Sequence, residues 1–367
     1  SAASDVYKRQ CLGWVTQFRT DQPVVVLLLP FGGLLIVFLY QKIGKEDRGT
    51  TQVLSTIRSQ DEVPLRSAPL IFIATALTHL LGGSAGREGA AIQLGGSIGN
   101  QLGRWIHLDE EDRHVIVMCG MSAAFAAVFG TPMAAAVFAM EVVSVGVMYY
   151  AALLPCVIAS IIAAEFATGM GIDPETFPVH SIPGLTVETG LKMALIAVGC
   201  GILSILFCIL LKTVGQLYAK YLKNPYIRIV VAAGVIILIT ICLNTKDYMG
   251  AGSGLIARAI EKGEARPLDF LWKMLLTALT MRAGYRGGEI VPAFSIGATF
   301  GCVAGGILGF SPELAAAASM VALFCGVTNC PITAMLISFE LFGFSGAAYY
   351  LIAISISYAV SGYYSLY

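Results

Sequence analysis

The sequence predicts an all-α polytopic membrane protein made of two related halves, with membrane helices that are broken part-way. Three observations support this prediction: a very apolar composition, apolar runs interrupted by glycine and proline, and two motifs that each occur twice. Of 367 residues, 57% are hydrophobic and 13% are charged, whereas soluble domains carry roughly 25% charged residues. The mean hydropathy is +0.77. We therefore expect the chain to lie in a lipid bilayer.

The apolar runs are the first element of this prediction, because a membrane-spanning helix needs about 20 predominantly apolar residues. Several of the runs are short or interrupted, and the chain contains 40 glycines and 14 prolines. Broken backbone is tolerated at membrane depth only where it is buried in protein or lines a cavity. We therefore expect some helices to stop within the membrane. The candidate runs are 23–40, 69–81, 115–142, 148–166, 191–211, 227–243, 270–281, 290–310, 314–341 and 347–360.

Composition also excludes several classes of function. Lysine plus arginine equals aspartate plus glutamate at 23 each, and no basic run predicts nucleic-acid binding. The nine cysteines form no C-x-x-C pair and the four histidines are scattered, so we expect no disulfide, metal or cofactor. The start, SAASDVYKRQ, lacks the apolar stretch of a signal peptide. We expect residues 1–367 to form one membrane domain that is open to truncation at both ends.

An internal repeat indicates how this domain is organised. A glycine, a glutamate two residues later and a second glycine eight residues beyond it occur twice, and so does a proline nine residues before a glutamate. The two glutamate pairs are 201 and 199 residues apart. We therefore expect two related halves, about 20–170 and 190–367, joined by the polar link 171–190. The repeated positions are Gly86, Glu88, Gly96, Pro132 and Glu141 in the first half, and Gly287, Glu289, Gly297, Pro331 and Glu340 in the second.

The stretch GREGAAIQ, residues 86–93, predicts a helix that begins at its glycines inside the membrane. The first turn of such a helix has unpaired N–H groups and the positive end of the helix dipole, which together favour an anion. Residues 287–294 offer a second start. Two such starts meeting near the bilayer midplane form an anion pathway. The Glu88 carboxylate competes with an anion for the same N–H groups, so we interpret Glu88 as a proton-sensitive gate.

Other readings of these charged residues stay open. Glutamate at a helix start is often only a favourable partner of the dipole, but membrane depth, the flanking glycines and the second copy favour the gate. Arg87 is better explained as a structural counter-charge or an interfacial side chain than as an ion ligand. Glu289 is equally well explained as a helix cap or an ion-path residue. Glu141 and Glu340 are typical of helix ends at the membrane interface, and Tyr363, Tyr364 and Tyr367 of an aromatic belt.

Three segments resemble signatures of the CLC family of chloride channels and anion/proton antiporters. GREGAAIQLGG resembles its G-[RK]-E-G-P signature, GGEIVPAFSIGATFG its G-x-F-x-P signature, and NCPITAMLISFE the helix that follows. The likeness extends from the apolar run at residue 23 to Tyr367 with the motifs in the same order. It implies a CLC-type fold of two inverted repeats with broken membrane helices, an anion pathway within each subunit, and a homodimer.

The resemblance also implies roles for single residues. Glu88 matches the family's gating glutamate, and Tyr367 matches a tyrosine whose hydroxyl closes the inner side of the anion site, with Tyr364 as the alternative. The amides of Arg87 and Gly89 lie near the gate in this reading. The residues whose amides face the central anion match Ile290 and Val291.

Departures from the family pattern indicate one of its branches. The G-S-G-I-P segment, whose serine binds chloride, should lie near KEDRGTTQV, which has neither that serine nor the proline. Thr50 or Thr51 supplies a hydroxyl there, or only caps the following helix. Val142 stands where proton-coupled chloride exchangers have an inner glutamate. Ile290 stands where the family has phenylalanine, and the acidic Glu289 precedes it. These features resemble the fluoride-exporting branch, CLC-F.

We therefore expect a multi-pass protein of the bacterial plasma membrane that exchanges fluoride for protons. The alternative within the family is a chloride/proton antiporter or a gated chloride channel. A membrane enzyme using Glu88 and Glu289 as paired carboxylates is a third hypothesis, but the sequence offers no nucleophile or metal cluster beside them. The expected partners are fluoride or chloride, protons, the lipid bilayer and a second copy of the chain.

Overall fold

The computed structural model describes residues 2–44, 53, 67–143, 148–172 and 174–366, and every regular element in these ranges is helical. This confirms the predicted all-α class. The first half contains α1 (Ala2–Asp21), η1 (Pro23–Leu28), α2 (Leu29–Lys42), α4 (Ser67–Leu80), α5 (Glu88–Trp105), α6 (Glu110–Phe129), α7 (Pro132–Glu141), η2 (Tyr150–Ala152) and α8 (Leu153–Gly169). The second contains α9 (Val187–Tyr221), α10 (Pro225–Leu243), α11 (Ser253–Glu261), α12 (Asp269–Ala283), α13 (Ile290–Ile307), α14 (Pro312–Thr328), α15 (Pro331–Phe342) and α16 (Ala347–Ser361).

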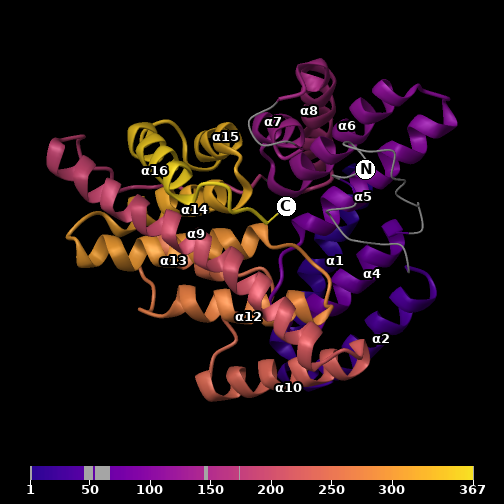
Figure 1. Ribbon diagram of the computed structural model, residues 1–367. Helices are drawn as coiled ribbons and strands as arrows, with labels where there is room; N and C mark the ends of the chain where they lie inside the picture. The colour runs from indigo at the N-terminus through magenta and orange to yellow at the C-terminus, as the bar shows by residue number, and fades with distance from the viewer. Residues whose placement is uncertain (1, 45–52, 54–66, 144–147, 173, 367) are drawn as a thin grey trace.

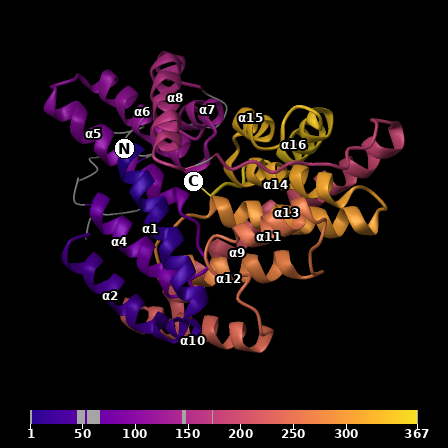
Figure 2. The ribbon, with the colours of Figure 1, turned by 180° about the vertical axis from the view of Figure 1, so that it is seen from behind.

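The helices of the two halves lie side by side. Helices α5 to α8, in purple and magenta, form one side of the molecule, and α13 to α16, in orange and yellow, form the other (Figures 1 and 2). The long helix α9 packs on α14 and α16, while α10 packs on α2 of the first half. The C-terminal end of the chain lies between the two sides (Figure 1).

Two of the predicted apolar runs are each divided into two helices. In run 115–142, α6 ends at Gly130, which has φ +72°, and α7 begins at Pro132. In run 314–341, α14 ends at Asn329, which has φ +57°, and α15 begins at Pro331. A residue with positive φ ends a helix, and proline is well tolerated at the first position of the next one. The same chemistry therefore breaks the chain at corresponding places in the two halves.

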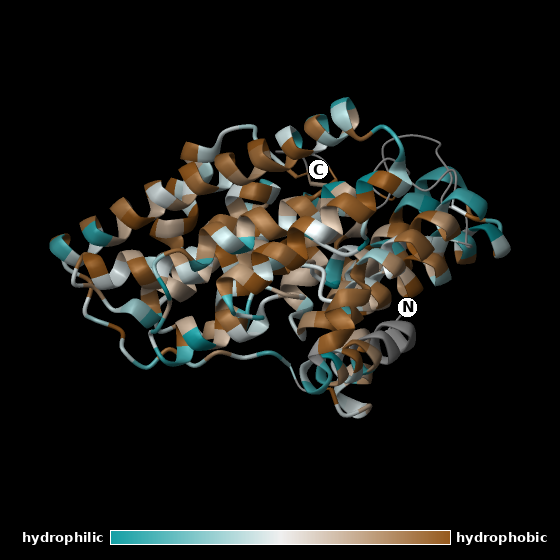
Figure 3. Cartoon of the chain, turned by 90° about the horizontal axis from the view of Figure 1, so that it is seen from below, coloured by the Kyte–Doolittle hydropathy of each residue, from teal (hydrophilic) through white to brown (hydrophobic). Residues whose placement is uncertain are grey.

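Six described helices are long and apolar enough to cross a bilayer, and five shorter apolar helices of 10–17 residues accompany them. The shorter helices fall below the length of about 20 residues needed for a full crossing. Apolar residues run along most of the helices, whereas hydrophilic residues gather in loops and near helix ends (Figure 3). This arrangement is that of a multi-pass membrane protein. The six long segments are Val24–Lys42, Glu110–Phe129, Tyr150–Gly169, Val187–Tyr221, Pro225–Leu243 and Ile290–Ile307.

Helices α5 and α13 each pack tightly on the helix that follows. A Cβ added to Gly95 of α5 would overlap the carbonyl oxygen of Gly120 in α6. A Cβ added to Gly297 of α13 would lie 2.5 Å from the carbonyl oxygen of Ser319 in α14. Small residues allow this backbone approach in membranes, where van der Waals packing drives helix association. The glycines thus hold the two site-forming helices in place.

The glutamates of the second repeated motif link α7 to α15. The Glu141 carboxylate accepts hydrogen bonds from Ile332 N at 3.1 Å and from Thr333 N and Oγ1 at 2.8 and 2.7 Å. In return, the Glu340 carboxylate accepts from Met133 N and Ala134 N, both at 2.9 Å. Each glutamate therefore satisfies otherwise unpaired amides at the start of the other helix. The sequence analysis had placed these residues at helix ends without indicating this exchange.

Candidate functional site

The starts of α5 and α13 are joined by backbone hydrogen bonds. Gly86 N donates to Gly288 O at 2.7 Å, and Gly288 N donates to Gly86 O at 2.8 Å. Helix α5 begins at Glu88 and α13 at Ile290. The unpaired N–H groups of both first turns therefore lie in the same buried region. The structure thus brings together the two helix starts that the sequence predicts to meet.

The Glu88 side chain crosses from the start of α5 to the start of α13. Its Oε1 accepts hydrogen bonds from Ile290 N at 2.7 Å and Val291 N at 3.1 Å. Its Oε2 is buried with no hydrogen-bond partner in the described part of the chain. Glu88 is 1% exposed, so its carboxylate competes with little water for these amides. A carboxylate oxygen thus lies where the sequence analysis expected an anion.

Glycines leave the space that the carboxylate fills. A Cβ added to either Gly86 or Gly288 would overlap the carboxylate of Glu88. The same added atom on Gly288 would lie 2.6 Å from Gly89 N, the next amide along α5. The Gly89 amide therefore lines the same small space, and a side chain at either bridging glycine would close it.

The Arg87 side chain is directed toward the link between the halves. Its guanidinium forms an ion pair with Glu175, and the two side chains are 20% and 26% exposed. Glu175 N in turn donates to Phe129 O, the last residue of α6, at 3.3 Å. This ion pair favours the structural counter-charge over the interfacial side chain as the explanation of Arg87. The pair also attaches the link to the residue before Glu88.

Glu289 occupies the N-cap position of α13 but makes no side-chain capping hydrogen bond. Its Oε1 instead accepts from Arg282 of α12 at 3.1 Å. Arg282 also lines a cavity of about 360 Å³ together with Lys212 and Tyr364. The helix-cap interpretation of Glu289 therefore lacks the hydrogen bond that defines a cap. The carboxylate instead pairs with Arg282 beside a cavity, as the ion-path interpretation requires.

Comparison with known proteins identifies the family. The model of the voltage-gated chloride channel family matches residues 32–362. The chain belongs to this CLC family. It is a family of channels and transporters rather than of enzymes. A chloride/fluoride channel protein of Pseudomonas syringae is 35% identical, over 97% of this chain and 80% of that protein. An H(+)/Cl(−) exchange transporter ClcA of Vibrio cholerae is 29% identical, over 70% of this chain and 58% of that protein.

Solved CLC structures confirm the predicted CLC-type fold. The crystal structure of a CLC-type fluoride/proton antiporter superposes with a TM-score of 0.96 at 33% sequence identity, covering 100% of this chain and 93% of that one. A slow cyanobacterial Cl−/H+ antiporter gives a TM-score of 0.81 at 18% identity, covering 98% and 90% of the two chains. At that identity the second likeness concerns the fold alone.

Tyr367, which the CLC resemblance assigns to the anion site, and Thr50 and Thr51, the two candidates for a hydroxyl there, lie outside the described residues. The alternative tyrosine, Tyr364, is half-exposed and lines the cavity of Arg282. Its carbonyl oxygen accepts from Asn329 Nδ2 at 3.3 Å, at the break between α14 and α15. Val142, at the position of the missing inner glutamate, is buried at the C-terminal cap of α7.

The sequence analysis missed a set of buried polar residues beside this CLC site. Lys273 of α12 is fully buried, and its Nζ donates to Ser84 Oγ at 3.0 Å, Tyr248 O at 3.1 Å and Gly250 O at 2.7 Å. Gly250 N donates to Gly83 O at 2.9 Å, close to the start of α5. A lysine inside the apolar run 270–281 was the signal available, since an ionisable residue at membrane depth is a functional candidate by default.

A cavity of about 350 Å³, lined in part by charged side chains, lies next to these residues. Arg19, His79 and Arg87 are among its lining residues. Arg19 donates to the carbonyl oxygen of His79, whose ring Nε2 is 3.3 Å from the carbonyl oxygen of Gly86. Basic side chains, together with the carboxylate of Asp247, therefore line an open space close to Gly86 at the start of α5. No sequence motif predicted this, because Arg19 and Arg87 are far apart in the chain.

Proposed function

We propose that this CLC protein is a fluoride/proton antiporter that exports fluoride, with Glu88 alternating between the anion position and a position outside it. The observation that carries this proposal is the pair of hydrogen bonds from Ile290 N and Val291 N to Glu88 Oε1. Ionised acceptors form stronger hydrogen bonds than neutral ones. The carboxylate therefore stands in for the permeant anion, and the two compete for one set of amides.

A proton changes the outcome of this competition. The buried Oε2 of Glu88 has no hydrogen-bond partner in the described ranges, and an unpaired buried polar atom is costly, more so when charged. Protonation neutralises the carboxylate and weakens its bonds to the two amides, so an anion displaces it. The displaced side chain carries its proton, which it releases before it returns. Each cycle thus couples anion movement to proton movement through one residue.

Fluoride as the substrate is supported by the relatives and by the sequence. The Pseudomonas syringae relative is named a chloride/fluoride channel protein, and the fluoride/proton antiporter structure matches the whole chain. Fluoride, which is small and strongly hydrated, needs strong donors to replace its hydration shell. Backbone amides at two helix starts and a protonated Glu88 are such donors. We propose that the Arg87 and Gly89 amides, the Tyr367 hydroxyl and a Thr50 hydroxyl complete the site.

Glu289 is proposed as an ion-path residue in partnership with Arg282. Their ion pair borders the cavity that also contains Lys212 and Tyr364. A cavity with two basic residues attracts anions, and the paired glutamate limits how tightly they are held. The Glu289–Arg282 pair thus controls how anions reach the site from the side of α12 and α13.

A chloride/proton antiporter or gated chloride channel is the second candidate. It is favoured by the likeness to the Vibrio cholerae H(+)/Cl(−) exchange transporter at 29% identity. Val142 opposes proton coupling through an inner glutamate, which leaves the gated channel as the stronger form of this alternative.

We further propose that the two halves, 20–170 and 190–367, are the inverted repeats of the family and that the protein is a homodimer in the bacterial plasma membrane. The reciprocal contacts of Glu141 and Glu340 support the repeat. Cross-linking in liposomes tests the dimer, which a purely monomeric product would contradict.

The proposed substrate is tested by anion efflux from liposomes that contain the purified protein. We expect fluoride, recorded with an ion-selective electrode, to leave faster than chloride under equal gradients. Protein-free liposomes supply the control for leakage. Chloride efflux at an equal or greater rate would move the protein to the chloride-transporting members of the family.

A further inference from the structure

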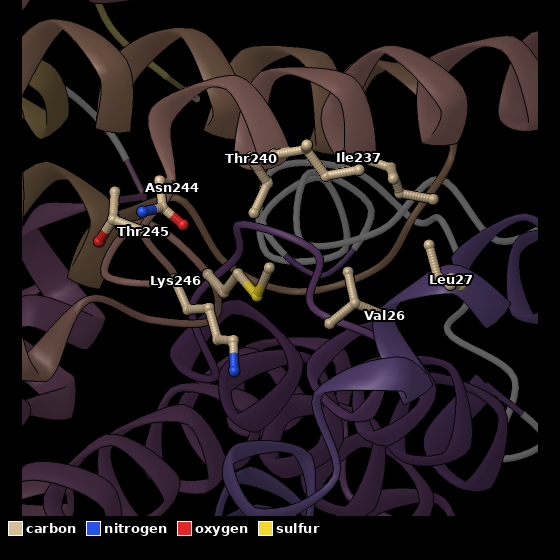
Figure 4. Close-up of a pocket in the computed structure, with 9 residues that line it drawn as sticks. Val26, Leu27, Ile237, Thr240, Asn244, Thr245 and Lys246 are labelled. Atoms are coloured by element: carbon tan, nitrogen blue, oxygen red, sulfur yellow. The ribbon is translucent and has the colours of Figure 1, made fainter.

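A cavity of about 520 Å³ lies outside the anion site, between η1 and the C-terminal end of α10. Val26 and Leu27 of η1 lie on one side, and Ile237 and Thr240 of α10 on the other (Figure 4). Its volume falls within the roughly 300–1,000 Å³ typical of ligand sites. Most of its wall is apolar, so it suits a hydrocarbon chain.

The cavity lies on the outer apolar face of the molecule that helix α10 forms. Helix α10 is one of the candidate membrane spans, and only 22% of its apolar window is buried inside the protein. Leu238 and Ile241 are 61% and 65% exposed. The helix ends at Asn244, which has φ +47°, so the chain leaves the span beside the cavity. Its polar end therefore lies where the helix meets the membrane boundary.

A lysine side chain marks that polar end. Asn244 and Lys246 line the cavity on the side opposite Leu27 (Figure 4). The neighbouring carboxylate of Asp247 is engaged by Arg258 at 3.1 Å and Arg266 at 3.8 Å. Within the described ranges, Lys246 itself has no ion-pair partner. The apolar cavity thus ends in a lysine whose charge no described carboxylate pairs.

We propose that this cavity binds an anionic phospholipid, with an acyl chain between η1 and α10 and the phosphate at Lys246. Basic pockets between membrane helices are suited to anionic lipid headgroups, and the adjoining apolar wall accommodates the chain that a soluble phosphate lacks. The amide of Asn244 adds a neutral hydrogen-bonding group beside the lysine.

This lipid would also contact a wall of the cavity next to the anion site. Lys246 and Met249 line both the lipid cavity and the one that contains Arg19 and Arg87. The same loop continues to Gly250, whose carbonyl oxygen accepts the hydrogen bond from Lys273. A lipid bound here therefore braces the loop, and we expect it to raise the thermal stability of the protein.

Native mass spectrometry of the whole protein in detergent tests the proposal directly. The probes are phosphatidylglycerol and phosphatidylcholine with identical acyl chains. We expect Lys246→Gln to weaken binding of phosphatidylglycerol about fivefold, since one lysine at an anionic membrane surface contributes about 1 kcal/mol. Lys223→Gln is the matched control, because Lys223 is exposed just before the other end of α10. It should change binding by less than twofold.

A second variant tests the apolar part of the cavity separately from the charge of Lys246. Thr240→Trp fills the space between α10 and η1, and we expect it to reduce binding of both lipids. Equal losses from Lys246→Gln and Lys223→Gln would reveal general adhesion to basic residues and overturn the proposal. Unchanged binding by Thr240→Trp, or equal retention of glycerol phosphate and phosphatidylglycerol by the wild-type protein, would overturn it as well.

Discussion

Replacing Glu88 by glutamine isolates the charge of the proposed gate. Glutamine keeps the shape of the side chain and an oxygen that accepts from Ile290 N and Val291 N, but it cannot carry the charge. Hydrogen bonds to charged groups contribute about 1.5–3 kcal/mol and neutral ones about 0.5–1.5 kcal/mol. For two bonds, the side chain therefore loses about 2–3 kcal/mol of attraction to the amides. The equilibrium constant with which the side chain competes against an anion for these amides therefore falls about 30- to 150-fold.

Isothermal titration calorimetry with fluoride measures this change on the purified protein. In alkaline buffer, where the wild-type carboxylate competes most strongly, Glu88→Gln should bind fluoride at least tenfold more tightly. The same variant should lose proton coupling, because it has no titratable group at this position. Glu261→Gln, at an exposed position of α11, is the control and should behave as the wild type. Equal or weaker fluoride affinity in Glu88→Gln, with coupling intact, would refute the competition.

Four further predictions concern the surrounding structure. Gly288→Ala should abolish transport without unfolding the protein, because the added methyl group overlaps the Glu88 carboxylate. Gly254→Ala, with open space around it, is the control. Retained transport by Gly288→Ala would contradict the geometry. Glu141→Ala should lower stability by about 2–4 kcal/mol, since it leaves three donors on Ile332 and Thr333 unpaired; an unchanged melting temperature would show that these bonds contribute little. Glu175→Gln should cost at most about 1 kcal/mol and leave proton coupling intact, whereas lost coupling would give Arg87 a part in gating. Tyr367→Ala should alter fluoride efflux more than Tyr364→Ala, and negligible effects of both would return these tyrosines to an aromatic belt.

The sequence predicts the two helix starts of the site because each depends on residues that are neighbours in the chain. Glycines around Glu88 and Glu289 allow close approach of backbone, and their recurrence indicates two equivalent helix starts. From these patterns the all-α class and the meeting of α5 with α13 follow. The breaks after Gly130 and Asn329 are local too, since each combines a residue of positive φ with a proline two residues later.

Features that depend on distant partners could not be predicted in this way. Glu141 and Glu340 exchange hydrogen bonds with helix starts about 190–210 residues away, and nothing near either glutamate identifies its donors. Glu175 lies in a polar link, where an ion pair with Arg87 depends entirely on how that link crosses the surface. Lys273 is a charge within an apolar run that the sequence analysis did not single out, and its three acceptors come from two separate loops that only the folded chain brings together.

The central claim is that one carboxylate couples an anion to a proton, and proton movement driven by fluoride tests it most directly. Liposomes containing the wild-type protein are loaded with fluoride, and the external pH is recorded after dilution into fluoride-free buffer with no pH gradient. The account predicts that protons enter the liposomes as fluoride leaves, so that the external medium becomes alkaline, and that Glu88→Gln shows fluoride efflux without this change. Fluoride efflux from the wild-type protein with no proton movement would contradict antiport and make the pathway a channel.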